Sequence, residues 1–298
     1  MELKNEFKAG FVAVIGRPNV GKSTLVNALL GQKIAAVTPK PQTTRKQQLG
    51  ILTLNHAQIM FTDTPGIHNA KHKLGEKMNE EAIKGLDSND AILFMLDSSD
   101  SLHNEDNYIF NILSKHKKTP ILITLNKIDK ANEEVLTFIA EKCKQYIPQA
   151  DLIKISSTKG TNLDKLLEWI INHLPEHPPF YPAEQITDHF ERDIAADLIR
   201  EAGLLMLRDE VPHGIAVRID NYVERGQVGA YIEATIFVER ESQKGIVIGK
   251  NGEMIKQISI HAREEIEAMS GKSVFLKIRV KVRKNWRNDD KFLKRFGY

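Results

Sequence analysis

The chain has few of the features that would place it outside a reducing compartment. It holds one cysteine, Cys143, among its 298 residues, so no intrachain disulfide is possible, and such sparing use is typical of cytosolic proteins. No apolar run approaches the roughly 18–20 residues that span a bilayer. The first ten residues, MELKNEFKAG, carry charges where a signal peptide needs an apolar core. These absences argue against secreted, disulfide-stapled and integral-membrane classes, and we expect a cytoplasmic protein.

The net charge is also small, but it is unevenly distributed. Lys and Arg number 42 against 39 Asp and Glu, which gives +3. Residues 272–298 alone carry ten basic side chains and two aspartates, a net +8, so the other residues are net acidic at −5. The 41% apolar content is ordinary for a globular chain, and this length fits two domains. The basic end indicates an anionic partner, either a nucleic acid or an anionic membrane surface.

Apolar runs of strand length alternate with helix-like segments through residues 1–173. This alternation predicts an α/β domain with a mostly parallel, doubly wound sheet. The candidate strands are 11–15, 46–54, 57–62, 90–96, 120–125 and 152–156, and the candidate helices are 21–30, 74–86, 104–117, 132–145 and 162–173.

A different order of predicted helices and strands follows a proline-rich stretch. Four of the 11 prolines fall within 174–182, and proline stiffens the chain and lacks an N–H donor, so we expect a linker over 174–187. Residues 188–298 then predict an α+β module of order α-β-β-α-α-β. Its candidate elements are a helix at 188–209, strands at 214–223 and 229–240 joined by a turn at 224–227, a glycine-punctuated segment at 245–252, a helix at 253–269 and a strand at 273–283.

The strongest local motif is GRPNVGKS, which matches the phosphate-loop pattern G-x-x-x-x-G-K-[ST]. It lies between the first strand and the first helix, where backbone N–H groups and the helix N-terminus can surround phosphate oxygens. Lys22 is expected to reach the β- and γ-phosphates, and the Ser23 hydroxyl to bind Mg²⁺. The predicted phosphate-binding residues are Gly16, Arg17, Pro18, Asn19, Val20, Gly21, Lys22, Ser23 and Thr24.

Two further motifs follow later strands. Asp63-Thr64-Pro65-Gly66 comes directly after 57–62, where Asp63 can hold the hydration shell of Mg²⁺ and the Gly66 N–H can sense the γ-phosphate.

The second of these, Asn126-Lys127-Ile128-Asp129, follows 120–125. The Asp129 carboxylate can accept two hydrogen bonds from guanine that adenine cannot offer. Lys127 would pack over the base, and Asn126 would tie the loop to the phosphate loop.

In this order and spacing, these motifs resemble those of the Ras-like GTPases. The resemblance implies that PKPQTTR at 39–45 is the first switch, in which Thr43 or Thr44, with a slight preference for Thr44, completes the Mg²⁺ shell with Ser23 and Asp63. It also implies that the guanine oxygen is met by the fifth motif, Ser156, Ser157 and Thr158, in which Ser157 replaces the usual alanine.

One position departs from the Ras pattern. Ile67 stands where a glutamine orients the attacking water, so we expect slow intrinsic hydrolysis. Asn19 resembles an asparagine that coordinates K⁺ in GTPases with this substitution, and Arg17 is a weaker candidate for the missing charge. The residues assigned to catalysis are therefore Lys22, Asn19, Thr44 and Gly66.

The C-terminal module resembles a type II KH domain. Gly249-Lys250-Asn251-Gly252 matches the GxxG loop, in which glycines let a turn between two helices approach a nucleic-acid backbone. Basic residues interleaved with Trp286, Phe292 and Phe296 follow, and this pattern suits stacking on bases. The alternative is a solvated basic end whose aromatics pack onto the module. The predicted RNA-binding residues are Gly249, Lys250, Asn251, Gly252, Lys281, Arg283, Lys284, Trp286 and Arg287.

A Ras-like domain followed by a type II KH domain resembles the Era family of GTPases. This resemblance implies a GTP/GDP switch that binds 16S ribosomal RNA near its 3′ end, assists 30S subunit assembly, and contacts the inner face of the membrane peripherally. The expected cofactor is Mg²⁺, to which Asn19 adds K⁺ as a candidate. No stable protein partner is evident from the sequence. Two alternatives stay open: an RNA chaperone whose nucleotide domain is only structural, and a membrane-surface GTPase without an RNA role.

Overall fold

The computed structural model describes residues 7–226 and 229–298. The chain divides into two compact units. The first contains the described residues up to Lys33 together with Thr44–Ala70 and Gly75–Asp188, and the second contains Ile34–Thr43, Lys71–Leu74 and His189–Tyr298. No helix within the described ranges is long and apolar enough to cross a membrane.

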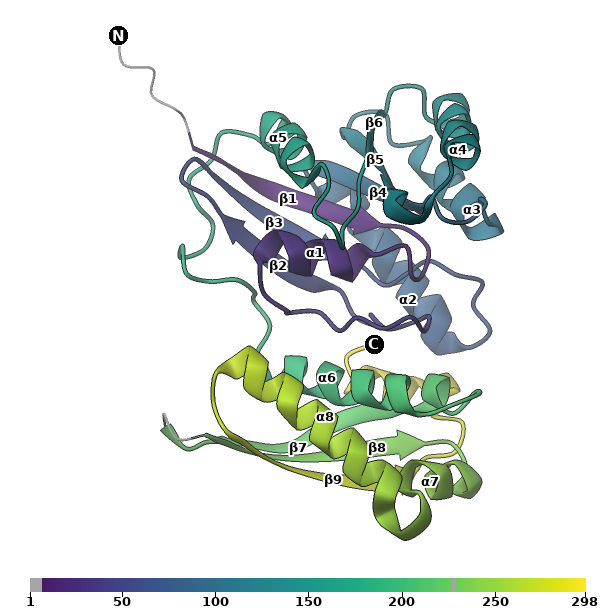
Figure 1. The fold of residues 1–298 in the computed structure, drawn as a ribbon, viewed down its shortest axis with the longest axis vertical. Helices are drawn as coiled ribbons and strands as arrows, with labels where there is room; N and C mark the ends of the chain where they lie inside the picture. The colour runs from purple at the N-terminus through teal and green to yellow at the C-terminus, as the bar shows by residue number, and fades with distance from the viewer. Residues whose placement is uncertain (1–6, 227–228) are drawn as a thin grey trace. The chain divides into compact units, whose positions relative to one another are not determined.

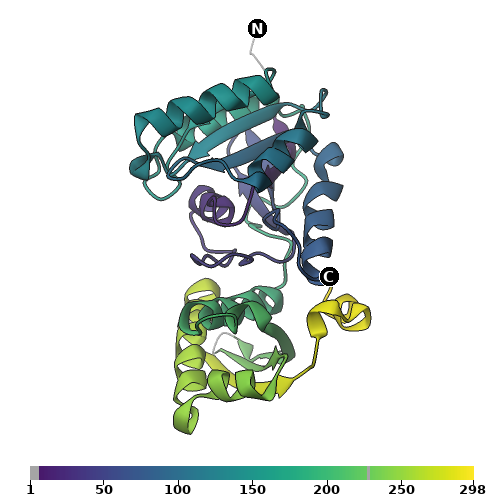
Figure 2. The ribbon, with the colours of Figure 1, turned by 90° about the vertical axis from the view of Figure 1, so that its right-hand side faces the viewer.

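The first unit is a sheet with helices on both faces (Figures 1 and 2). Its strands are β1 (Lys8–Ile15), β2 (Gln48–Thr53), β3 (Ala57–Asp63), β4 (Ala91–Asp97), β5 (Ile121–Asn126) and β6 (Asp151–Lys154), in the spatial order β2-β3-β1-β4-β5-β6. Its helices are α1 (Lys22–Leu30), α2 (Lys73–Lys84), α3 (Asn104–Leu113), α4 (Glu133–Tyr146) and α5 (Leu163–His173). The predicted doubly wound, mostly parallel sheet is confirmed.

Among the described strands of this first sheet, β2 and β3 form the one antiparallel pair. Three residues separate these strands, and a parallel crossover needs a dozen or more. The central strand β4 is buried along its whole length, because α2, α3 and α4 pack side chains such as Phe110 and Ile139 against one face of the sheet while α1 and α5 lie on the other (Figure 1). This arrangement leaves the carboxyl ends of the parallel strands at one edge, where ligands bind in such sheets.

The proline-rich segment 174–187 is fastened to the first unit. The Gln58 side chain accepts hydrogen bonds from the N–H groups of Phe180 (2.7 Å) and Tyr181 (2.9 Å), and the Pro175 carbonyl accepts one from β1. Prolines tolerate such an edge position because they need no donor partner. The segment therefore extends the sheet edge, an addition that the linker prediction did not contain.

The second unit contains a three-stranded sheet of order β7-β8-β9, from β7 (Ala216–Glu224), β8 (Ala230–Val238) and β9 (Val274–Val282). Its helices α6 (Glu191–Met206), α7 (Glu241–Ile248) and α8 (Glu253–Ser270) give the predicted order α-β-β-α-α-β. Helices α6 and α8 cover one face of the sheet (Figure 1), where Leu198, Ile258 and Ile236 share one core. The predicted turn at 224–227 lies partly outside the described residues.

A short helix that the sequence pattern did not predict, α9 (Asp290–Arg295), follows the last strand. It begins where the Asp289 carboxylate caps the N–H groups of Lys291 and Phe292. The preceding turn places Trp286 at 0% exposure, and its Nε1–H donates to the Gly214 carbonyl at 2.9 Å. The prediction that Trp286 stacks on RNA bases is therefore wrong, because the ring belongs to the core of the module.

Candidate functional site: a nucleotide pocket and a GxxG loop

The phosphate loop joins β1 to α1 at the carboxyl edge of the first sheet. The Lys22 side chain is 6% exposed, and its Nζ donates to the carbonyls of Gly16 (3.1 Å) and Arg17 (3.0 Å). Burial lowers the pKa of Lys22 to about 8, although the nearby Asp63 carboxylate opposes this shift. The loop thus holds a cation beside backbone carbonyls that a phosphate can replace as partners.

Three oxygen-bearing side chains meet beside this lysine. Ser23 Oγ donates to Asp63 Oδ2 at 2.6 Å and lies 2.8 Å from Thr44 Oγ1. Of the two candidate threonines, Thr44 is the one that points here, because the Thr43 hydroxyl donates instead to the carbonyl of Lys40.

The third member of the group, Asp63, is fully buried, and burial raises the pKa of its carboxyl to about 6. Its Oδ1 has no hydrogen-bond partner among the described residues. An orphaned carboxylate oxygen beside two hydroxyls is the donor set that a hard cation prefers, so these residues fit Mg²⁺. Within the described ranges no group of three His, Cys, Asp or Glu side chains could hold a metal ion alone. Mg²⁺ would thus also need phosphate oxygens, as is usual for this ion.

The segment Asp63–Gly66 approaches the phosphate loop closely. A Cβ added at Gly66 would lie 2.6 Å from the Pro18 nitrogen, which no real Cβ tolerates, so only glycine fits. The Thr64 hydroxyl donates to the Val14 carbonyl at 2.7 Å and fixes the segment to β1. The next residue, Ile67, is 1% exposed within the core under α2 and α3. Its side chain is both apolar and turned inward, and it cannot position a water molecule.

The predicted base-recognition residues are interlinked. Asn126 Nδ2 donates to the Val20 carbonyl at 2.8 Å, and its Oδ1 accepts from the backbone N–H of Ser157 at 3.0 Å. Ser156 Oγ donates to Asp129 Oδ1 at 2.6 Å, which lowers the pKa of this exposed carboxyl. Asn126 therefore ties three loops together, and Asp129 stays ionised as an acceptor.

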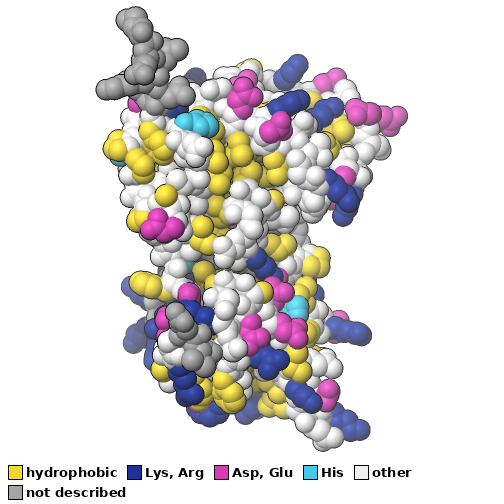
Figure 3. Space-filling view, turned by 60° about the vertical axis from the view of Figure 1, so that its left-hand side comes forward, with side chains coloured by type: hydrophobic (Ala, Val, Ile, Leu, Met, Phe, Trp, Pro, Cys, Tyr) yellow, Lys and Arg dark blue, Asp and Glu magenta, His cyan; other side chains and the backbone are white. Residues whose placement is uncertain are grey.

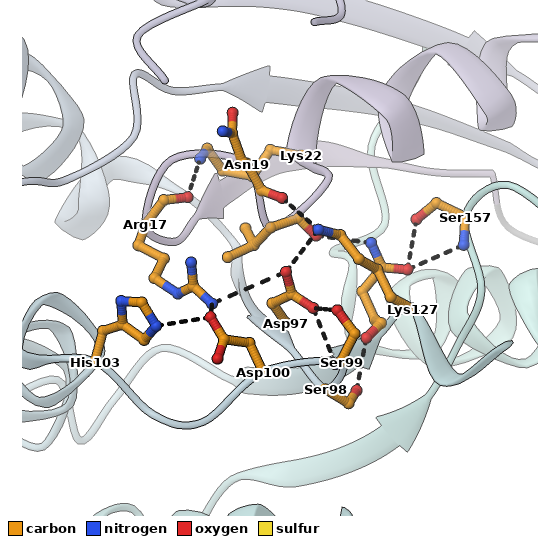
Figure 4. A network of polar contacts seen from close by, with 12 residues as sticks. Arg17, Asn19, Lys22, Asp97, Ser98, Ser99, Asp100, His103, Lys127 and Ser157 are labelled. Atoms are coloured by element: carbon orange, nitrogen blue, oxygen red, sulfur yellow. Dashed lines mark hydrogen bonds and ion pairs between the residues drawn. The ribbon is translucent and has the colours of Figure 1, made fainter. Parts of the chain in front are cut away.

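Two acids that the motif analysis missed, Asp97 and Asp106, support the outer side of the phosphate loop, and Figure 4 shows the first of them beside Lys127. Asp97 Oδ2 accepts from Lys127 Nζ at 2.6 Å, and the same lysine donates to the Asn19 carbonyl at 2.8 Å. The buried Asp106 on α3 accepts from Arg17 Nε at 3.2 Å. Asp97 ends a buried strand at the carboxyl edge of the sheet, and that position is a signal that could have identified it.

This network corrects the proposed role of Arg17. Its guanidinium faces Asp106, Asp97 (3.9 Å) and Asp100 (3.6 Å). It is thus paired by carboxylates of β4, α3 and the loop between them, and its charge is not available as an arginine finger. Its backbone remains part of the phosphate loop.

The GxxG loop lies between α7 and α8, and its shape comes from the backbone. Gly249, Asn251 and Gly252 have φ values of 75°, 53° and 78°. A Cβ at Gly249 would lie 2.8 Å from the Met254 nitrogen, so the close approach to α8 requires glycine. Lys250 and Asn251 are exposed. The loop therefore presents a positive side chain and the N-terminus of an 18-residue helix to solvent.

The basic residues at the end of β9 and just after it differ in exposure and in pairing. Lys281 and Lys284 are exposed, whereas Arg283 pairs with Asp289 and the half-buried Arg287 pairs with Glu239, both at 2.5 Å. The aromatic residues of the tail are turned inward: Phe292 and Phe296 are buried and stack on each other. The expectation that they stack on bases is wrong for the same reason as for Trp286.

A P-loop nucleotide site on a doubly wound sheet and a GxxG loop in an α+β module define a GTPase with a KH-type RNA-binding domain. Family models agree: "50S ribosome-binding GTPase" matches residues 11–127 and "KH domain" matches residues 210–287. Similar solved structures include Era in complex with MgGDPNP and nucleotides 1506–1542 of 16S ribosomal RNA, and a variant of Aquifex aeolicus Era bound to GDP.AlF4⁻. Each is 40% identical, with a TM-score of 0.92, and the match covers 98% of this chain and 99% of the other. The chain belongs to the Era family of GTPases.

Proposed function

We propose that this chain is a GTP-hydrolysing switch that binds 16S ribosomal RNA near its 3′ end and assists assembly of the 30S subunit. The observation that carries the proposal is the match, along 98% of the chain, to Era holding both MgGDPNP and a 16S fragment. The G-domain family model has a 50S description, but it covers residues 11–127 alone. The match that includes the KH-type module therefore decides in favour of the small subunit.

The nucleotide roles follow from the contacts of each side chain. The backbone N–H groups of residues 16–24 other than Pro18, together with Lys22, would surround the phosphates, and the Gly66 N–H would meet the γ-phosphate. Asp129 would read guanine, with Lys127 over the base and Asn126 and Ser156–Thr158 holding the surrounding loops. Ser23, Thr44 and Asp63 would hold Mg²⁺, which when bound neutralises charge on the β- and γ-phosphate oxygens. The orphaned Asp63 oxygen disfavours the alternative of a merely structural nucleotide domain.

Hydrolysis in this site is proposed to be slow and dependent on K⁺. The Ile67 side chain is apolar and buried in the core, and Arg17 is paired with carboxylates, so neither side chain supplies orientation or charge to the reacting phosphate. Asn19, held at φ 64° and fixed through its carbonyl by Lys127, is proposed as the K⁺ ligand. A bound K⁺ would supply positive charge near the γ-phosphate, which is the contribution an arginine finger makes.

On the RNA side, the GxxG loop is proposed to hold a single-stranded backbone segment, with Lys250 and the N-terminus of α8 facing phosphate. Lys281 and Lys284 would add phosphate contacts, and Arg283 and Arg287 would contribute less because each is paired with an acid. We propose that the protein binds RNA in the cytoplasm. Peripheral contact of its basic C-terminal end with an anionic membrane is proposed as a secondary association.

The test is crosslinking to RNA in cell lysate, with mapping of the crosslinked nucleotides. We expect crosslinks concentrated at the 3′ end of 16S RNA, stronger with a non-hydrolysable GTP analogue than with GDP. The matched control pairs Lys250→Asp/Asn251→Asp with Lys142→Asp/Lys144→Asp on α4, which makes a comparable charge change in the other unit. Crosslinks spread over 23S RNA, or unchanged by the first variant, would contradict the proposal.

A further inference from the structure

The three-stranded sheet of the second unit has two faces, and α6, α7 and α8 cover only one. Inner residues such as Ile232 and Ile236 lie in the core with these helices. The alternate residues point outward: β8 and β9 run parallel in register, with Tyr231 opposite Phe275 and Glu233 opposite Lys277. The outward positions therefore form a second surface, on the other side of the sheet from its helices.

Helix α9 closes one end of this surface and leaves the other end open. At the closed end, Phe237 packs edge-on against Phe292 and Phe296. At the open end, Phe275 is 64% exposed and stacks on Tyr231, with ring centroids 5.5 Å apart and planes 9° from parallel. One face thus carries two aromatic clusters, of which one is covered and the other meets solvent.

A line of positive charge runs along β9 from this aromatic pair. Lys277, Arg279 and Lys281 are exposed at alternate positions, about 6.6 Å apart by strand geometry. Glu233 pairs with both Lys277 (3.1 Å) and Arg279 (3.5 Å), so one carboxylate neutralises only part of the charge of two basic side chains. Figure 3 shows several Lys and Arg side chains close together on the surface of the second unit.

Counted over the outward positions of all three strands, four basic residues face two acidic ones, a net +2. The other two charged residues are Arg218 and Asp220 on β7, which pair with each other at 2.6 Å. A cavity of about 290 Å³ adjoins the aromatic pair and is lined in part by Arg225, Ala230, Ser273 and Phe275. Its volume is just below the roughly 300–1,000 Å³ of small-molecule pockets, so it is an open recess beside the rings.

We propose that this outer platform, defined as Tyr231, Phe275, Lys277, Arg279 and Lys281, is a second contact surface for single-stranded RNA, separate from the GxxG loop. Exposed aromatics for bases beside a cationic row for the backbone are the elements that hold single strands without strict sequence preference. The positive surface complements a polyanion. The inference rests on the proposed RNA-binding function and shares only Lys281 with the residues assigned to it above.

The test compares two RNAs and two pairs of variants. The RNAs are nucleotides 1506–1542 of 16S RNA and a short single-stranded piece of its 3′ end that fills only the GxxG loop. Platform variants are Phe275→Ala and Lys277→Ala/Lys281→Ala. Their matched controls on α4 are Phe138→Ala, which removes another half-exposed ring, and Lys142→Ala/Lys144→Ala. Thermal unfolding checks that each variant folds.

We expect Phe275→Ala to weaken the longer RNA at least fivefold and the short RNA by less than twofold. The double lysine variant should flatten the salt dependence for the longer RNA by about 1.4 units, the single-strand value for two phosphate contacts. The controls should bind as the unmodified chain does. A photoreactive benzoylphenylalanine at position 275 should crosslink to the longer RNA.

Other outcomes separate this proposal from the proposed function. If the platform variants bind both RNAs normally while Lys250→Asp/Asn251→Asp loses affinity, the platform is overturned and the GxxG assignment stands. If the platform variants lose affinity and the GxxG variant does not, the loop assignment fails and the platform stands. Loss of binding to vesicles containing phosphatidylglycerol with unchanged RNA affinity, or a crosslink from position 275 to a second copy of the chain, would replace RNA with a lipid or protein partner.

Discussion

Two loops of this molecule are proposed to hold phosphate, and they are built in opposite ways. Both precede a helix, and both need glycine. In the loop at 16–23, buried and bonded side chains fix the site and add a charge to its backbone N–H groups: Lys22 is buried and bonded, and Arg17 is locked to Asp106. In the loop at 249–252, the backbone carries the site, with three residues at positive φ and the two middle side chains exposed.

The difference has an energetic meaning. A buried, interlinked site is organised before its ligand arrives, so less ordering entropy is lost on binding, and loss of one member leaves others unpaired. In an exposed loop whose backbone shape is fixed, each side chain contributes less to the binding free energy, and its contribution is independent of the others. Changes in the nucleotide site should therefore cost more than comparable changes in the GxxG loop.

The largest effect is expected at the base. Asp129→Asn should weaken GTP binding on the order of a thousandfold, because an amide donor replaces the acceptor that guanine needs. Binding of xanthosine triphosphate should improve, since xanthine carries an acceptor where guanine has its amine. Competition between the two nucleotides is the measurement, and an unchanged GTP affinity would remove Asp129 from the base site.

The two loops can then be compared directly by the same substitution. Lys22→Ala should cost about 2–4 kcal/mol of GTP binding, the scale of a desolvated charge-assisted contact. Lys250→Ala should weaken RNA binding only a fewfold, because its side chain is exposed and the loop shape persists. Calorimetry of each variant with its ligand gives both numbers. Equal losses of binding free energy in the two variants would contradict the proposed difference between the loops.

The pH dependence of GTP binding tests burial in the first loop. A proton and Mg²⁺ compete for Asp63, whose pKa burial raises to about 6, so Mg²⁺-dependent affinity should fall about tenfold for each pH unit below 6. Above about pH 8 the unliganded Lys22 loses its proton, and affinity should fall again. Asp63→Asn should remove the acid limb and keep the alkaline one; an acid limb that survives this change would assign it to another group.

The smallest effect concerns the ion at Asn19. GTP hydrolysis should be severalfold faster in K⁺ than in Na⁺ at matched ionic strength, since a site shaped for one ionic radius fits the other poorly. Asn19→Ala should equalise the two rates. Phosphate release measured in both salts decides, and equal rates in the unmodified chain would leave no role for K⁺.

The sequence predicted what depends on contiguous residues. The motifs at 16–23, 63–66, 126–129 and 249–252 and their places at the ends of strands and helices are local patterns. The mostly parallel, doubly wound character of the first sheet followed from the alternation of strands and helices, because parallel strands need helical crossovers.

What the sequence did not reveal depends on distant pairs. The Arg17–Asp106 bond joins residues 89 positions apart, and Gln58 holds a segment more than 120 positions away. Trp286 illustrates the same limit: a basic, aromatic stretch is compatible both with base stacking and with a core covered by cations. Only the acceptor at the Gly214 carbonyl and the packing of α9 distinguish the two. The residue types indicated which interactions these side chains can make. Tertiary packing decided whether each side chain faces the core or the solvent.

The measurement that tests the account most directly is RNA affinity of Lys250→Asp/Asn251→Asp over a range of salt, with GTP affinity measured in parallel. Two carboxylates would oppose phosphate while the glycines keep the turn. We predict at least a tenfold loss in affinity for the 3′ end of 16S RNA, a salt slope flatter by about one unit, and unchanged GTP affinity. Retention of both RNA affinity and salt slope would show that the GxxG loop is only a structural turn and would contradict the account.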